Sequence, residues 1–190
     1  ITGGSAQATG QTSISQTLTN TTSAPATATY TVTPRSGTCN GSSFTVTVTV
    51  NPTPVLNSGL TPADVCSNTT FTYTPTSLTT GTTFSWTRLG AAGITTTEPA
   101  TGTDGISQVL RNFTSETIPV TYEYLLTANG CTNTRQVVVN IKPEPVIADQ
   151  SASVCSGEAL THHILLDNFD NPDDNVTFTW PAPELSGGLT

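Results

Sequence analysis

Two stretches of this chain share a pattern and an ending, which limits the folds open to it. Residues 44–55 read FTVTVTVNPTPV, and residues 137–146 read VVVNIKPEPV. Alternation of apolar residues with threonine is typical of a β-strand, and proline cannot donate to a strand ladder. The sequence therefore predicts that one strand, closed by one pair of prolines, occurs twice.

The rest of the chain repeats with nearly the same period. Matching residues lie 92 positions apart before the second proline pair, and 89 to 94 positions apart in the segments that follow each pair. The matching pairs are Ile14 and Ile106, Gln16 and Gln108, Leu18 and Leu110, Asn20 and Asn112, Tyr30 and Tyr122, Cys39 and Cys131, Cys66 and Cys155, and Trp86 and Trp180. A period of about 90 residues is that of a β-sandwich domain.

This period divides the chain into three parts. Residues 1–53 correspond to the C-terminal half of one repeat, residues 54–143 to a complete repeat, and residues 144–190 to the N-terminal half of a following one. Neither half can bury a complete core by itself, so we expect the chain to be part of a longer tandem array.

The composition predicts an all-β chain. Roughly a fifth of the residues are threonine, which is β-branched and favours strands over helices. Thirteen prolines and fifteen glycines separate the strand-like runs. Within residues 54–143 the predicted strands are Val55–Leu60 or Ala63–Cys66, Phe71–Pro75, Thr83–Arg88, Gly93–Thr97, Ile106–Phe113, Val120–Ala128 and Thr134–Lys142. Short strands at this spacing predict a two-sheet, immunoglobulin-like Greek-key sandwich.

Several residues have predicted structural roles in these repeats. Trp86 is expected between the two sheets, and Trp180 at the matching position of the next repeat. Tyr122 fits either a tyrosine corner or plain core packing, and Tyr30 at the matching position is expected to be a structural core residue. Asn129-Gly130 suits a tight hairpin turn, because both residues accept positive φ. The residues expected to form stiff joints between repeats are Pro52, Pro54, Pro143 and Pro145.

Charge and the length of the apolar runs each exclude one class of partner. The net charge is −8, and the five basic residues are scattered along the chain. With no basic face to release counterions from phosphates, nucleic-acid binding is excluded. No apolar run approaches the ~18 residues that a membrane span requires, so direct membrane insertion is excluded as well.

Five segments together resemble a known family. They are VNPTPV, VCSNTTF, TTFSWT, TYEYLLTANGC and VVVNIKPEPV. The chain resembles the PKD-like, immunoglobulin-like tandem repeats of very long Bacteroidetes surface proteins, including gliding-motility adhesins exported by the type IX secretion system. It departs from polycystin-type PKD domains, because Ser85–Gly90 replaces their WDFGDG signature. The resemblance implies a β-sandwich at the bacterial cell surface.

The four cysteines are candidates for disulfides. They are Cys39, Cys66, Cys131 and Cys155. Zinc is disfavoured, because no pair has CxxC spacing. Disulfides in an oxidising compartment account for them best. Two schemes remain open: a bond between Cys66 and Cys131 within one repeat, or bonds between neighbouring repeats.

Other polar clusters give weak signals. His162 and His163 are adjacent, so on a strand they point to opposite faces and cannot hold one metal together. A calcium loop at Asp167, Asp170, Asp173 and Asp174 is less favoured than a solvated loop, because the matching loop of the preceding repeat has no acidic residue. Asn20, Asn40, Asn68, Asn112 and Asn175 stand in N-x-S/T sequons, which permit glycosylation.

No catalytic motif stands out, so the sequence predicts neither an enzyme nor a required cofactor. The favoured function is an extracellular structural and adhesive module that spaces or presents binding regions in a long surface filament. Its expected partners are neighbouring repeats, surface polysaccharide or other surface proteins. The alternative is a carbohydrate-binding accessory domain of a secreted glycan-degrading enzyme, which would need an exposed aromatic platform.

Overall fold

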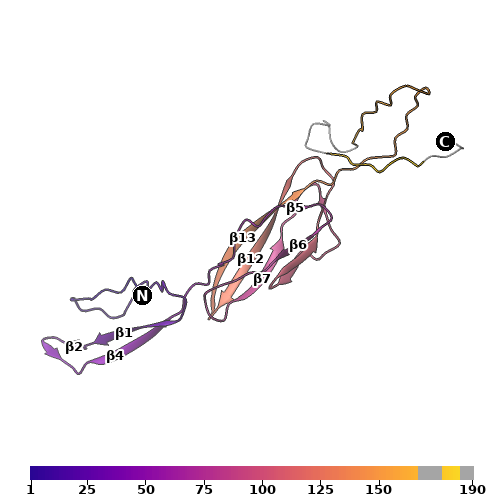
Figure 1. Cartoon of the computed structure of the whole chain (residues 1–190). Coiled ribbons are helices and arrows are strands. Elements are labelled where there is room, and N and C mark those ends of the chain that lie inside the picture. The colour runs from indigo at the N-terminus through magenta and orange to yellow at the C-terminus, as the bar shows by residue number, and fades with distance from the viewer. Residues whose placement is uncertain (167–176, 185–190) are drawn as a thin grey trace.

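A computed structural model describes residues 1–166 and 177–184 of the chain. The described residues contain thirteen β-strands and no helix, so none of their elements is a helix able to cross a membrane. Figure 1 shows an elongated arrangement, with a sandwich in the middle, a hairpin at the N-terminal end and an extended segment at the C-terminal end. The predicted all-β fold is confirmed.

The larger layer of the central sandwich, residues 54–143, is a five-stranded sheet. Its strands in spatial order are β5 (Val65–Cys66), β13 (Cys131–Lys142), β12 (Ile118–Ala128), β7 (Thr83–Arg88) and β9 (Thr101–Thr103). All neighbours are antiparallel except β5 and β13. Asn129 and Gly130 join β12 to β13 with φ values of 51° and 80°, which is the tight turn that the sequence predicts.

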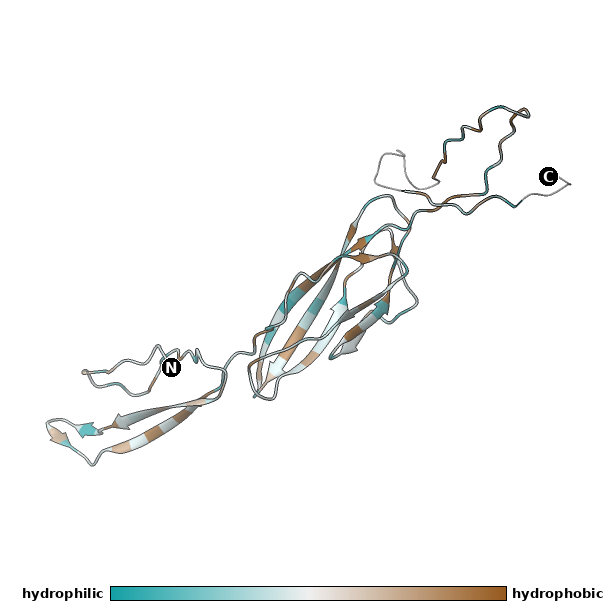
Figure 2. Ribbon diagram, in the orientation of Figure 1, coloured by the Kyte–Doolittle hydropathy of each residue, from teal (hydrophilic) through white to brown (hydrophobic). Residues whose placement is uncertain are grey.

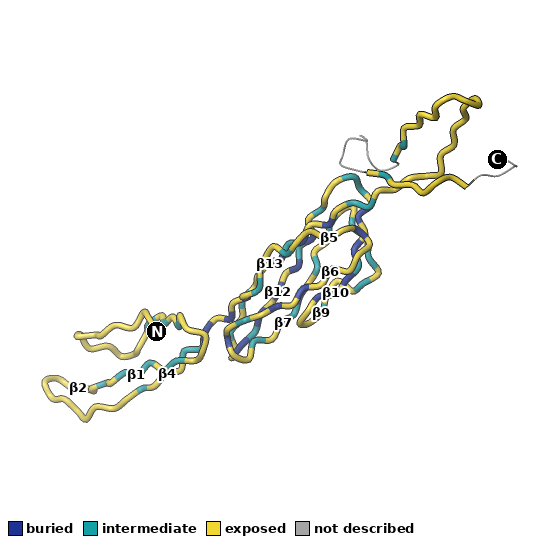
Figure 3. Tube along the Cα trace, in the orientation of Figure 1, coloured by how far each residue is buried: buried dark blue, intermediate teal, exposed yellow. Residues whose placement is uncertain are grey.

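Four short strands form the opposite layer. Strand β6 (Thr70–Tyr73) pairs with β10 (Ile106–Val109), and β8 (Ile94–Thr95) pairs with β11 (Arg111–Asn112). Aromatic rings fill the space between the layers: Phe71 and Trp86 each lie 5.6 Å from Tyr122, centroid to centroid. Figure 3 shows that buried residues concentrate in this central sandwich.

The N-terminal residues form a hairpin that no second sheet covers, although residues 1–20, which contain no strand, lie beside it and contact it through Gln16 and Asn20. Its long strands are β1 (Ala26–Val32) and β4 (Phe44–Val50), and β2 (Arg35–Ser36) and β3 (Cys39–Asn40) form its tip. Apolar and polar residues alternate along β4, as Figure 2 shows. Tyr30 pairs with Val46 here, and Tyr122 pairs with Val137 in the central sandwich, so the two hairpins share one register.

Apart from shifts of a few residues at strand ends, the strand predictions differ from the structure in three places. Strand β9 was not predicted, because Thr-Gly-Thr is short and has no apolar pattern. The strand predicted over Ile106–Phe113 is interrupted at Leu110, whose side chain is buried in the core. Of the two positions considered for the first strand, the structure has a strand at Val65–Cys66, while Leu56 packs into the core outside any strand.

Candidate functional site

The connection between residues 1–53 and the central sandwich is held by side-chain amides. Asn51 follows β4, and its Nδ2 donates to the carbonyl oxygen of Asn129 at 2.7 Å. From β13, Asn133 Nδ2 donates to the carbonyl oxygen of Pro54 at 2.8 Å. Pro52 and Pro54 are themselves buried. Both prolines restrict φ and are buried, which limits the backbone conformations open to this joint.

The second proline pair lies in different surroundings. Lys142 holds the position that corresponds to Asn51, and its Nζ lies 3.4 Å from Asp64 Oδ2 within the central sandwich. Pro143 is half-buried and Pro145 is exposed. The two joints therefore repeat their prolines but not the side-chain contacts around them.

A buried asparagine joins β11 to the C-terminal end of β13 and to the turn before β12. Asn112 Nδ2 donates to the carbonyl oxygens of Glu116 at 2.7 Å and Ile141 at 2.8 Å. Its Oδ1 accepts from the backbone N and Oγ1 of Thr114, at 3.0 and 2.7 Å. With its amide buried and fully hydrogen-bonded, Asn112 has a structural role that its N-x-T sequon does not reveal.

The same bonds recur 92 residues earlier. Asn20 Nδ2 donates to the carbonyl oxygens of Ala24 and Val50, both at 2.8 Å. Its Oδ1 accepts from the backbone N and Oγ1 of Thr22, at 2.9 and 2.8 Å. The repeat read from the sequence thus extends to individual hydrogen bonds.

A second buried cluster joins the two layers. Tyr122 donates its hydroxyl to Gln108 Oε1 at 2.8 Å, and Arg88 donates to the same oxygen. Arg88 also donates to the carbonyl oxygen of Glu98 at 3.2 Å, which holds the β8–β9 loop against the sandwich. Burial raises the pKa of Tyr122 to about 12, although the nearby charge of Arg88 opposes this, so the hydroxyl stays a neutral donor at physiological pH.

This cluster decides between the two roles considered for Tyr122. Its partner is a side chain, whereas a tyrosine corner bonds to the backbone, so core packing is its role. Tyr124 makes a backbone bond instead, to the carbonyl oxygen of Asp104 at 3.1 Å. Tyr30 repeats the side-chain bond, donating to Gln16 Oε1 at 3.1 Å.

The residues expected in cores differ in burial. Trp86 is buried between the layers as predicted, while Tyr30 is half-buried and Trp180 is exposed. The difference has a physical reason: Tyr30 has only the strandless residues 1–20 beside it, and the described residues after Lys142 form no strand, so neither ring is covered by a second sheet.

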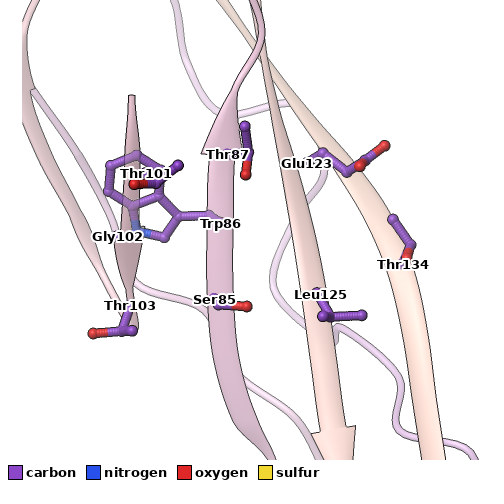
Figure 4. Close-up of a pocket in the computed structure, with 9 residues that line it drawn as sticks. All are labelled: Ser85, Trp86, Thr87, Thr101, Gly102, Thr103, Glu123, Leu125 and Thr134. Carbon is purple, nitrogen blue, oxygen red and sulfur yellow. The ribbon is translucent and has the colours of Figure 1, made fainter. Parts of the chain in front are cut away.

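A hollow of about 460 Å³ opens on the sheet beside Trp86 (Figure 4). Threonine and serine hydroxyls from β7 and β9 surround it, and Glu123 is the one ionisable side chain in its lining. A single carboxylate among hydroxyls, with no second acid-base group in the lining, provides no catalytic constellation. The Trp86 indole lies on Gly102 at this edge, with its Nε1 buried and, within the described structure, without a hydrogen-bond partner.

The cysteines lie at opposite ends of the sandwich. Cys131 begins β13 beside the joint with residues 1–53, whereas Cys66 pairs with Lys142 at the other end of that strand. Eleven residues at ~3.3 Å each separate them by about 36 Å, far beyond the ~7 Å Cα limit for a disulfide. None of the four cysteines is disulfide-bonded in the structure. The fold therefore excludes the within-repeat scheme, and bonds between neighbouring repeats stay a prediction.

The histidines and acidic residues form no metal site in the described part. His162 Nε2 lies 2.9 Å from Gln150 Oε1, and residues 1–166 and 177–184 contain no group of three His, Cys, Asp or Glu that could hold a metal ion. The calcium loop considered at Asp167, Asp170, Asp173 and Asp174 lies outside the described residues.

Comparison with known families matches this architecture. A family model described as a PKD-like domain matches residues 1–54 and 63–145, which include both hairpins and the first proline joint. The chain belongs to the PKD-like domain family. No curated protein matches the chain. PKD-like domains are usually extracellular and are typically non-catalytic structural modules, so family membership indicates an extracellular structural or adhesive module.

Proposed function

We propose that this PKD-like chain is a rigid spacer in a long extracellular surface protein, holding adhesive regions at a set distance and orientation. The packed joint between residues 1–53 and the central sandwich carries the proposal. Asn51 donates to the carbonyl oxygen of Asn129 across it, Asn133 binds the carbonyl oxygen of Pro54 on the sandwich side, and two buried prolines restrict its φ angles. A joint that transmits orientation is what a spacer requires.

The finer assignment is to a Bacteroidetes cell-surface adhesin of the gliding-motility type, exported by type IX secretion. It is supported by the resemblance of segments such as VCSNTTF and TYEYLLTANGC to repeats of those proteins. Neighbouring repeats are the partners that the joint contacts support most directly. Surface polysaccharide or other surface proteins would be bound by the regions that the spacer presents.

The carbohydrate-binding alternative has less support from the aromatic residues. Five of the seven aromatic side chains in residues 54–143 are buried in the core, and Phe84 packs partly buried against it. Phe113 is exposed, with the Arg111 guanidinium 4.9 Å from its ring centroid. A single aromatic ring covered by a cation is a poor stacking platform for a sugar.

Single-molecule energy transfer tests the spacer. Dyes would be attached to Cys39, near the hairpin tip, and to Cys66, at the far end of the sandwich, in a chain with Cys131→Ser and Cys155→Ser. A fixed joint predicts one narrow distance distribution, broadened by Asn133→Ala combined with Pro54→Gly. Asn57→Ala is the matched control, because no side-chain bond crosses the joint there. A broad distribution in the chain with native joint residues would contradict the spacer function.

A further inference from the structure

We propose that a disulfide crosses each joint between repeats, linking the cysteine at the Cys66 position of one repeat to the cysteine at the Cys131 position of the next. Cys131 itself then bonds to the counterpart of Cys66 in the repeat whose C-terminal half is residues 1–53. Cys66 bonds to the counterpart of Cys131 in the repeat that follows residue 143. The bond lies at the joint on which the proposed spacer function rests, and it deepens that function.

Cys66 lies where the last strand of the sandwich reaches the following joint. In the parallel pairing of β5 with β13, Cys66 is the partner of Lys142, the last residue of β13. The backbone N of Ser67 donates to the carbonyl oxygen of Lys142 at 2.9 Å, which holds the turn after β5 in place. Figure 1 shows β5 at the end of the sandwich away from the N-terminal hairpin. Because Cys66 is exposed there, its thiol is accessible to the next repeat.

The first joint preserves the position at which such a turn packs. Asn51 lies 91 residues before Lys142 and occupies the matching place after β4. In the central sandwich, the backbone N of Asn112 donates to Ser67 Oγ at 2.9 Å, so the corner around Asn112 binds the turn after β5. Asn20 holds the matching corner with the same side-chain bonds. A cysteine at the Cys66 position of that repeat is therefore the strand neighbour of Asn51.

Cys131 meets the same joint from the other side. It begins β13, directly after the Asn129-Gly130 turn, and it is half-buried. Asn51 Nδ2 donates to the carbonyl oxygen of Asn129 in this turn at 2.7 Å. Asn51 is thus the common neighbour of both cysteines, since strand partners lie about 4.8 Å apart. Two thiols that share this neighbour can approach to the ~7 Å between Cα atoms that a disulfide requires.

Both kinds of cysteine recur with the repeat. Val154-Cys155-Ser156 repeats Val65-Cys66-Ser67, and Cys39 lies 92 residues before Cys131. Cys39 is at the tip of the β1–β4 hairpin, as Cys131 is at the tip of the β12–β13 hairpin. A tandem array of such repeats therefore brings one cysteine of each kind to every internal joint.

Formation of the bond is a two-electron oxidation. The two thiols lose two protons and two electrons as one S–S bond forms, and a disulfide oxidant such as oxidised glutathione is reduced to two thiols. Disulfides persist in the extracellular surroundings that are usual for PKD-like domains. A joint with two covalent connections, the backbone at residues 51–54 and the disulfide, resists the bending that a single connection permits.

A tandem chain tests the proposal. It contains two copies of the sandwich, residues 54–141 and 54–142, joined through Asn51-Pro52-Thr53 as in the first joint. The buried core cluster lies between Leu56 and Ile141, so each copy retains a sandwich able to fold by itself. The inner-pair variant keeps Cys66 of the first copy and Cys131 of the second, with the other two cysteines replaced by serine. The outer-pair variant keeps the opposite two and is the matched control.

The two variants should differ in a glutathione redox buffer. The inner-pair variant should lose both free thiols while staying monomeric, as measured by alkylation and intact mass. The outer-pair variant should keep both thiols, because its cysteines lie at the far ends of the tandem chain. Pro52→Gly combined with Pro54→Gly at the joint should lower the effective concentration of the inner pair several-fold, since a looser joint holds the thiols together less often.

Two outcomes would overturn the proposal. The outer pair could oxidise as readily as the inner pair, or the inner pair could stay reduced under conditions in which separate chains already form disulfide-linked dimers. Either result would leave the spacer function untouched. The distances that test the spacer are measured in a chain with Cys131→Ser and with a dye on Cys66, which cannot form this bond.

Discussion

The hairpins β1–β4 and β12–β13 have the same register and different surroundings. Ala26 pairs with Val50 as Ile118 pairs with Ile141, after shifts of 92 and 91 residues. Yet the inward residues of β12 and β13 are buried, while those of β1 and β4 are half-buried or exposed. Register and turn are therefore encoded within half a repeat, whereas burial depends on the strands that the other half contributes.

The two regions form matching side-chain hydrogen bonds but differ in how far the residues that form them are buried. Asn20 and Asn112 make matching hydrogen bonds, and so do Tyr30 and Tyr122. Only the second member of each pair is fully buried. Since stability follows the area removed from water, matched substitutions in the two regions should differ in cost although the bonds they remove are alike.

The largest difference is expected for the paired tyrosines. Tyr122→Ala should cost about 3–5 kcal/mol of unfolding free energy, because it removes a ring packed against Phe71 and Trp86. Tyr30→Ala should change the same unfolding transition by less than about 0.5 kcal/mol, since Tyr30 lies outside the sandwich core. Urea unfolding followed by tryptophan fluorescence measures both. Equal costs would show that the hairpins are energetically equivalent.

The next largest difference in stability is expected for substitutions of the paired glycines Gly102 and Gly10. Gly102→Ala should cost toward the upper end of about 1–3 kcal/mol, because its Cβ would overlap the Trp86 indole and force the ring to move. Gly10→Ala has open space and should stay within about 0.5 kcal/mol. Thermal unfolding of dilute samples checks this pair. A Gly102→Ala variant as stable as the native chain would mean that the Trp86 indole moves aside without cost, and that a glycine is not required opposite it.

The paired asparagines test the hydrogen bonds separately from the rings. Asn112→Ala leaves the carbonyl oxygens of Glu116 and Ile141 without their amide donor, at an expected cost of about 1–3 kcal/mol. Asn20→Ala exposes its carbonyl partners to water and should cost less. Amide hydrogen exchange at the end of β13 and at the end of β4 reports each corner. Identical losses of protection at both would show that burial does not strengthen this network.

Local features of the fold could be predicted from the sequence. Strand β7 and the Asn129-Gly130 turn were predicted correctly, because alternation and positive φ depend on neighbouring residues. The need for Gly102 could not be predicted, since it arises from an indole on another strand. The corner role of Asn112 was hidden because Asn-x-Thr also forms a glycosylation sequon.

Long-range geometry could be predicted only in part. An immunoglobulin-like topology places the turns that hold Cys66 and Cys131 at opposite ends of the sandwich, and the structure agrees, whereas the parallel pairing of β5 with the C-terminal end of β13 is not specified by two residues of strand sequence. The recurrence of hydrogen bonds 92 residues apart could have been proposed from the aligned Asn, Gln and Tyr pairs. The boundaries at residues 54 and 143, the disulfides and the calcium loop stay predictions.

The smallest effect is expected at the second joint, where Lys142 replaces the residue type found at Asn51. Asp64 accepts a hydrogen bond from Asn140 at 3.1 Å and faces Lys142, and these contacts lower the pKa of its carboxyl below the ordinary value. A lowered folded-state pKa stabilises the protein above the unfolded-state pKa, and this contribution is lost as the pH falls through the folded-state value. Because the pair is exposed, Asp64→Asn should leave the melting temperature at pH 7 nearly unchanged and should slightly flatten its fall between neutral and acidic pH. A large loss at pH 7 would mean that this joint, like the first, depends on its side-chain contacts.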